Sequence, residues 1–146
     1  RELDGVKYYN DSKATNTDAS ITALKSFKEG VILLVGGFEK GLSMDEMKKY
    51  LGCVKAVIGY GLSGRRIACD LTDTDPEAAM SSTAIKDACG RSVQIVKDMN
   101  EAVTAARALS VYGDTVLLSP TTSSFDQYPN FEERGKHFKK IVSELR

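Results

Sequence analysis

The sequence lacks an excess of charge of either sign. Its 20 Lys and Arg residues balance its 20 Asp and Glu residues, so the formal net charge is zero. No bulk field draws such a chain to nucleic acid or to an anionic membrane surface, and we expect neither as a partner. The sequence also has no apolar run near the ~20 residues of a membrane span, and no signal peptide. We therefore expect a cytoplasmic protein whose binding site is local.

Cysteine and histidine are also scarce. Cys53, Cys69 and Cys89 are scattered and lack the spacing of a metal site, which favours reduced structural thiols over disulfides or zinc. The single histidine, His137, lies in the last helical pattern without a partner motif, so a surface position is a better interpretation than a catalytic base. We expect no metal site in this chain.

The length is that of one domain. The chain has 146 residues, of which 42% are hydrophobic, and we expect residues 1–146 to bury one core and to fold alone as a monomer. It begins at Arg1, almost at its first expected strand, and not at a methionine. We therefore expect a domain excised from a longer protein.

Short β-branched or apolar runs alternate with helical patterns along the whole chain. The expected strands are residues 6–9, 31–35, 53–58, 92–96 and 115–119. The expected helices are residues 17–27, 44–51, 65–71, 77–89 and 98–109 and a last helix after Asn130. Strands that alternate with helices imply crossover connections. The predicted fold is therefore α/β, a Rossmann-like, open and mostly parallel sheet with helices on both faces.

Local signals place several of the helix ends. Asn16, the Ser43-to-Glu46 spacing, the Asp98-to-Glu101 spacing and Asn130 with Glu133 are typical of helix starts. Glycines at positions 30, 52 and 90 are typical of residues just after a helix end.

Polar residues collect where three of the expected strands end. The first strand runs into Asn10-Asp11-Ser12-Lys13-Ala14-Thr15-Asn16, the second into a glycine-rich loop with Lys40, and the last into the hydroxyl-rich residues 121–129. In an open α/β sheet these exits share one edge, where free helix N–H groups favour anions. Capping residues in solvated turns and an exposed, solubilising lysine are the plainer interpretation, which the pattern alone leaves open.

A second motif follows the strand at residues 53–58. Gly59, Gly61 and Gly64 satisfy G-x-G-x-x-G between a strand and a helix, which indicates a dinucleotide-binding module for NAD or FAD. The fingerprint also needs an acidic residue at the end of a strand about 20 residues on, and here that interval is the polar loop 72–77. Glycines that serve tight turns are the alternative interpretation.

The three strand exits resemble the C-terminal domain of the Mur ligase family, and the resemblance covers essentially the whole chain. It is carried by residues 10–16, by Gly36-Gly37 with Lys40, and by two runs near the C-terminus, Leu118-Ser119-Pro120 and Ser124-Phe125-Asp126-Gln127, followed by residues 130–135. Ser-Lys-Ala-Thr at residues 12–15 is similar to the version in the branch of the family that adds D-glutamate. The fold implied is the Mur ligase C-terminal domain.

The resemblance implies an ATP-dependent amide ligase of peptidoglycan precursor synthesis. ATP phosphorylates the carboxylate of UDP-N-acetylmuramoyl-L-alanine to an acyl phosphate, and the amine of D-glutamate attacks it. In this family an N-terminal domain holds the nucleotide substrate and a central P-loop domain holds most of ATP and Mg²⁺. The 146 residues contain no G-x-x-x-x-G-K-[ST], so we expect these two domains to be the missing partners and the isolated domain to be inactive, with no catalytic residue of its own.

The resemblance also assigns roles to single residues. For D-glutamate it implies contacts from Thr15, Lys40, Ser124, Phe125 and Phe131, the phenylalanines through backbone groups. These types suit a dianionic amino acid, since Lys40 supplies charge and the hydroxyls supply direction.

The implied ATP contacts lie in the opening stretch. Asp11 matches a carboxylate that contacts the ATP ribose, and Lys13 matches a position facing the phosphates. Phe125 and the pair Thr121-Thr122 depart from the family pattern, which leaves the shape of that loop open.

Overall fold

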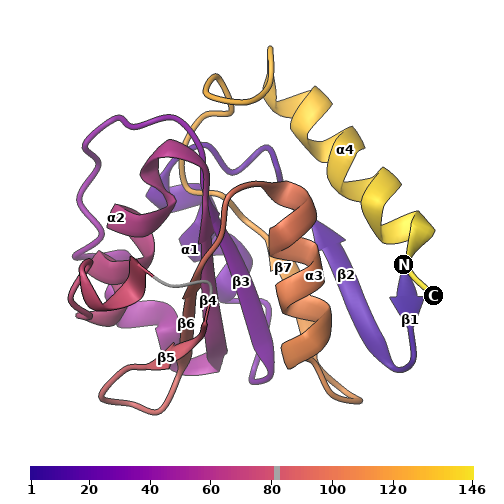
Figure 1. Ribbon diagram of the computed structural model, residues 1–146, viewed down its shortest axis with the longest axis horizontal. Helices are drawn as coiled ribbons and strands as arrows, with labels where there is room; N and C mark the ends of the chain where they lie inside the picture. The colour runs from indigo at the N-terminus through magenta and orange to yellow at the C-terminus, as the bar shows by residue number, and fades with distance from the viewer. Residues whose placement is uncertain (81–82) are drawn as a thin grey trace.

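The computed structural model describes residues 1–80 and 83–146, which form a seven-stranded sheet flanked by helices (Figure 1). The strands are β1 (Glu2–Leu3), β2 (Val6–Asn10), β3 (Val31–Gly36), β4 (Val54–Tyr60), β5 (Ile85–Lys86), β6 (Ser92–Ile95) and β7 (Thr115–Leu118). The helices are α1 (Thr17–Leu24), α2 (Gly61–Thr72), α3 (Met99–Leu109) and α4 (Phe131–Glu144), with 3₁₀ helices η1 (Met47–Cys53) and η2 (Ala78–Met80). None of these helices is long and apolar enough to cross a bilayer.

The sheet has the order β1-β2-β7-β3-β4-β6-β5. The five inner strands are parallel, whereas β1 and β5 pair antiparallel at the two edges. β3 lies in the middle, and residues Val31 to Val35 are fully buried. The predicted α/β class and the central position of the second expected strand are confirmed, while the two short edge strands were not expected.

Alternate side chains of the strands pack on opposite faces, as the pleat requires. Ile32 and Leu34 join the core beneath α3 and α4. Leu33 and Val35 join the core beneath α1, η1 and α2. Figure 1 shows α3 in front of the sheet and α1 behind it, so both faces are covered as predicted.

Three of the predicted helix starts are confirmed by their cap geometry. Asn16, Asp98 and Asn130 have extended backbone, and each side chain accepts a hydrogen bond from the amide three residues on, at 2.9, 3.0 and 2.8 Å. Such a cap satisfies one of the free donors of the first turn.

Three expected helices have different bounds. The one expected over residues 65–71 starts earlier, at Gly61, and ends at Thr72. The first expected helix ends at Leu24, so Gly30, with φ of 72°, lies in the turn before β3 and not at the helix end. Between Ser43 and Gly52 the chain forms a 3₁₀ helix that starts only at Met47 and runs through Gly52. The reason is local: the Ser43 hydroxyl accepts from the Asp45 amide at 3.2 Å and forms a turn where a capping box would need Glu46.

The helix expected over residues 77–89 is wrong in the described part of that range, which excludes residues 81 and 82. The chain there forms the single turn η2 and then β5, a partner of β6. Asp87 organises the hairpin, because its Oδ1 accepts from the Cys89 and Arg91 amides at 2.9 and 2.8 Å. Such turns of Asp compete with helix.

Candidate functional site

The ends of β2, β7 and β3 lie side by side at one edge of the sheet. The three strands are parallel neighbours, so the residues after Asn10, Leu118 and Gly36 emerge together. The chain leaves β2 and β3 toward the α1 and η1 face but leaves β7 toward α4 on the other face. Neighbouring exits that turn to opposite faces mark the switch point where open α/β sheets bind ligands.

Backbone hydrogen bonds tie the three exit loops into one unit. The Phe38 amide donates to the Ser123 carbonyl at 2.8 Å, and the Thr122 hydroxyl donates to the Phe38 carbonyl at 2.7 Å. The Thr121 amide donates to the Ala14 carbonyl at 3.0 Å. The loop after β7 therefore lies between the other two and contacts both.

Arg134 is buried beneath this junction, on the face of α4 that also carries Phe138, although the charge of an arginine favours an exposed position. Its Nε donates to the Ser12 hydroxyl at 2.9 Å, its Nη2 to the Ser12 carbonyl at 2.8 Å and its Nη1 to the Thr122 carbonyl at 3.0 Å. Burial lowers the pKa of the guanidinium and raises that of the neighbouring Tyr60 phenol. The sequence also contained one signal of close packing here, a glycine inside the helix at position 135. The structure explains it, because a Cβ on Gly135 would lie 2.8 Å from the Asn10 side chain.

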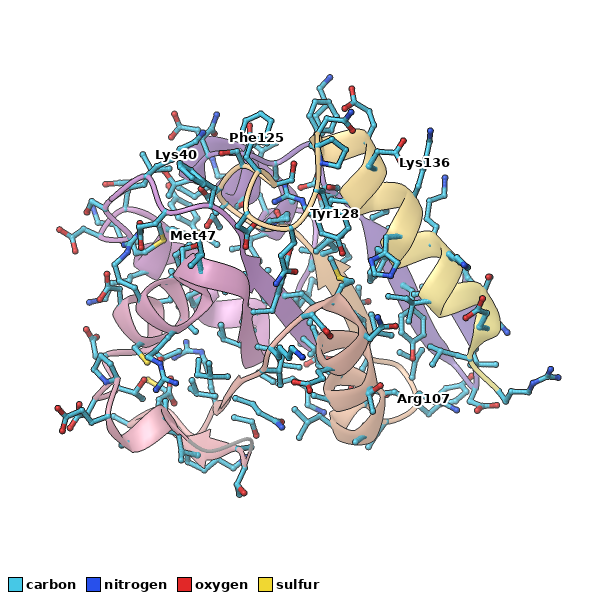
Figure 2. The ribbon with its side chains drawn as sticks, turned by 45° about the horizontal axis from the view of Figure 1, so that its top comes forward. Lys40, Met47, Arg107, Phe125, Tyr128 and Lys136 are labelled. Carbon is cyan, nitrogen blue, oxygen red and sulfur yellow. The ribbon has the colours of Figure 1, made fainter. Side chains whose placement is uncertain are left out.

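Lys40 and Thr15 are brought together from two different loops. The Lys40 Nζ lies 3.5 Å from the Thr15 carbonyl oxygen, a long contact that leaves the ammonium exposed. Figure 2 shows Lys40 and Phe125 at the same end of the molecule. A cation held there with its solvent face open can bind the carboxylate of a ligand.

The loop after β7 holds hydroxyls without partners. The Thr121, Ser123 and Ser124 side-chain oxygens are buried and have no hydrogen bond within residues 1–80 and 83–146. Thr121 also has φ of 69°, a strained value for a β-branched residue. Buried polar groups without partners are unusual in folded proteins, and they are candidates for ligand contacts.

Asp11 lies beside this loop. The Ser119 hydroxyl donates to its Oδ2 at 3.0 Å, and half-burial raises the pKa of the carboxyl group in spite of that bond. Lys13 is exposed on the side of α4, where it lines a hollow of about 270 Å³ with Lys136 and Lys139. An acceptor and a cation on one short turn can serve two parts of a ligand.

The two phenylalanines differ in their surroundings. Phe125 is 66% exposed. Phe131 is half-buried at the start of α4, and its carbonyl accepts from the Ser12 hydroxyl at 2.8 Å. The structure thus ties Phe131 to the opening turn and leaves the Phe125 side chain in solvent.

The glycine motif serves packing. The first three amides of α2 already donate: Gly61 to the Lys97 carbonyl, Leu62 to the Asp126 carboxylate and Ser63 to the Gly37 carbonyl, at 3.3, 3.2 and 3.0 Å. A pyrophosphate would need these donors, and the Asp126 charge would repel it. The dinucleotide interpretation is therefore not favoured.

The residues with metal-binding chemistry are dispersed. Within the described ranges, no group of three or more His, Cys, Asp or Glu side chains could hold a metal ion. The three cysteines are free thiols, Cys53 and Cys69 buried and Cys89 exposed. His137 is half-buried, and its Nδ1 lies 2.6 Å from the Tyr128 hydroxyl.

Comparison with known proteins identifies the family of the chain. Residues 1–122 match the family model described as Mur ligase, glutamate ligase domain. The chain is 44% identical to a UDP-N-acetylmuramoylalanine--D-glutamate ligase of Alkaliphilus metalliredigens and 40% identical to one of Thermoanaerobacter sp. strain X514, over 99% of this chain in both cases. It spans only 29% and 30% of the lengths of these curated relatives.

Among solved structures, the MurF ligase of Thermotoga maritima in complex with ADP is 18% identical, with a TM-score of 0.48 over 99% of this chain and 30% of that one. The family assignment does not depend on this likeness, because the family model covers most of the sequence. The chain belongs to the Mur ligase family, as its glutamate ligase domain.

Proposed function

We propose that the chain is the C-terminal, amino-acid-binding domain of a three-domain cytoplasmic ligase, a monomer that joins D-glutamate to UDP-N-acetylmuramoyl-L-alanine in peptidoglycan precursor synthesis. Family membership and the names of the relatives support this reaction. The observation that carries it is the meeting of Lys40 with Thr15 beside the loop after β7, in which the Thr121, Ser123 and Ser124 hydroxyls have no partner among the described residues. A cation and several hydroxyls are what a dicarboxylic amino acid requires.

In this proposal, the chain's own residues hold and orient D-glutamate. Lys40 pairs with one carboxylate, Thr15 and Ser124 donate hydroxyl hydrogen bonds, and backbone groups of Phe125 and Phe131 complete the site. The amine must attack as the neutral base, and none of these contacts is assigned to it. Orientation of this kind lowers the barrier by removing the entropy cost of alignment.

ATP supplies the activated acyl phosphate on the other substrate, and Mg²⁺ and most of the nucleotide belong to the domains outside this chain. Asp11 fits a ribose hydroxyl, since its carboxylate is half-buried and oriented by Ser119. Lys13 fits the phosphates, because its ammonium is exposed beside the same turn.

The chain alone should neither turn over ATP nor form the amide. Its binding of D-glutamate should be millimolar or weaker, because a half-built polar site supplies roughly −4 kcal/mol. Phosphate release and calorimetric titration with D-glutamate measure both. Amide formation by the chain alone, or micromolar binding, would contradict the division of the site between domains.

Asp11→Asn and Thr15→Val should affect different substrates of the full-length ligase. Asp11→Asn loses the charge-assisted bond to a ribose hydroxyl and should raise the KM for ATP roughly tenfold, about 1.4 kcal/mol, with the KM for D-glutamate unchanged. Thr15→Val removes one hydroxyl at nearly constant volume and should raise the KM for D-glutamate by the equivalent of roughly 1 to 2 kcal/mol. Steady-state kinetics with each substrate varied in turn measure this. The assignment is wrong if both variants affect one substrate, or neither affects any.

The stability of Asp11→Asn is its control. The folded state raises the pKa of Asp11, so folding favours the protonated form, and the wild type loses stability as the pH rises above the unfolded pKa of about 4 through the folded value. Asn carries no such charge. Asp11→Asn should therefore be at least as stable as the wild type at pH 7, and denaturant unfolding at pH 4 and pH 7 separates lost function from lost fold.

A further inference from the structure

The first turn of α2 holds both loops that carry the candidate D-glutamate contacts. The Ser63 amide and hydroxyl both donate to the Gly37 carbonyl at 3.0 Å, which fixes the start of the Lys40 loop. The Leu62 amide donates to the Asp126 carboxylate at 3.2 Å, two residues after Ser124. One helix end thus contacts the loop after β3 and the loop after β7.

Arg66, one turn further along α2, binds the part of the Lys40 loop on either side of Lys40. Its Nε and Nη2 donate to the two oxygens of Glu39 at 2.8 and 2.7 Å, and its Nη1 donates to the Leu42 carbonyl at 2.8 Å. The pairing with Arg66 lowers the pKa of the Glu39 carboxyl group. A planar guanidinium bound through both edges fixes direction as well as distance. Lys40 therefore lies between two anchored points, Glu39 and Leu42.

The glycines of the motif make this arrangement possible. A Cβ on Gly61 would lie 2.4 Å from the Asp126 Oδ2, where it would expel the carboxylate from the helix start. A Cβ on Gly59 would lie 2.2 Å from the Gly64 carbonyl, so this pair lets α2 approach β4. The G-x-G-x-x-G pattern thus brings a helix end close to two loops.

The geometry points to Arg66 and Asp126 as positioning residues for D-glutamate, Arg66 acting through Lys40 and Asp126 acting through Ser124. The inference rests on the proposed function. Within the part of the chain that the structure describes, the one contact of the Lys40 ammonium is the long one to Thr15, so the backbone held by Arg66 sets where it lies. Neither residue is assigned a direct contact with the amino acid.

A stabilising role alone does not account for these contacts. The side chains of Arg66 and Glu39 are 32% and 41% exposed, and exposed ion pairs add little to stability. Displacing a binding group by even an ångström, in contrast, has large kinetic effects. Arg66 and Asp126 should therefore matter more for the KM than for folding.

The test is a set of double variants of the full-length ligase. Arg66→Met and Asp126→Ala should each raise the KM for D-glutamate about tenfold, with kcat and the KM for ATP within twofold. Arg66→Met should add nothing to Lys40→Ala but its full factor to Ser124→Ala. Asp126→Ala should add nothing to Ser124→Ala but its full factor to Lys40→Ala.

Two further variants test whether the KM effects arise only from a less stable fold. Glu39→Gln keeps the side-chain shape and the Arg66 bond to Leu42 but weakens the pairing with Arg66, so it should raise the KM for D-glutamate by less than Arg66→Met does, at unchanged thermal stability. Asp73→Asn breaks the Lys48–Asp73 pair, 2.5 Å long at the other end of α2, and should leave every kinetic constant unchanged.

The possible outcomes distinguish a failure of the positioning role from a failure of the proposed function. If the effects multiply in all four combinations, or Asp73→Asn matches Arg66→Met, α2 contributes stability only and the inference is overturned. If the wild-type ligase does not use D-glutamate at all, the proposed function fails first, whatever the variants do.

Discussion

Lys40→Ala in the full-length ligase should raise the KM for D-glutamate about 30- to 150-fold while kcat changes little. The loss corresponds to roughly 2 to 3 kcal/mol, the usual cost of a charge-assisted hydrogen bond to a carboxylate. It falls on the KM because the carboxylate is not a reacting group, so the contact is equal in the ground and transition states. Initial rates over a range of D-glutamate concentrations measure it.

Lys49→Ala is the matched control for this experiment. Lys49 is an exposed lysine of η1 that pairs with Glu46 at 3.1 Å, away from the strand exits. Its removal should change neither the KM for D-glutamate nor the KM for ATP, since an exposed ion pair of this kind contributes little to stability. An unchanged KM for D-glutamate in Lys40→Ala would reduce Lys40 to a solubilising surface charge.

Arg134→Met should lower the free energy of unfolding of the chain by about 3 kcal/mol. Methionine fills the volume but leaves the Ser12 and Thr122 carbonyls buried without donors, and each lost partner costs roughly 1 to 3 kcal/mol. Relief of the buried charge offsets part of the loss. Denaturant unfolding followed by circular dichroism gives the difference.

Arg134→Lys should recover only part of the stability, because the single nitrogen of an ammonium cannot reach the three acceptors that three separate guanidinium nitrogens bind. Arg107→Met is the control, since Arg107 pairs with the exposed Asp4 at the surface. The denaturant concentration at the midpoint of unfolding of this variant should stay near that of the wild type. A wild-type midpoint for Arg134→Met would mean that the three bonds beneath the site add nothing to the fold.

The sheet could be predicted because its signals are local. Val31 to Val35 is a continuous apolar run, and only a strand buried on both faces explains it in so short a segment. The caps at Asn16, Asp98 and Asn130 were readable for the same reason, since a cap acts over three residues. The hairpin at β5 was missed because it depends on hydrogen bonds from the Cys89 and Arg91 amides to the Asp87 side chain. The spacing of apolar residues carries no information about such a turn.

In the candidate site, too, local features could be predicted from the sequence and long-range contacts could not. The strand exits with Thr15, Lys40 and Ser124 could be found in the sequence, because polar residues after apolar strands are a local pattern, and family resemblance added their roles. Contacts between distant segments could not. Arg134 meets Ser12 across 122 residues, and Asp126 meets Leu62 across 64. Position 134 lies on the apolar face of the helix, but arginine is rarely buried, and only the packed structure shows the partners that let it be so.

The position of β7 also determines when the site can form during synthesis. β2 and β3 are neighbours in sequence but do not pair; each pairs with β7, which is the last in sequence of the seven strands described. Until residues 115–118 emerge, β2 can pair only with β1, and one edge of β3 stays open, which is the kind of edge that recruits other chains. The edge that carries the candidate site is thus assembled when this strand inserts, so a nascent chain lacks the site until β7 has joined the sheet.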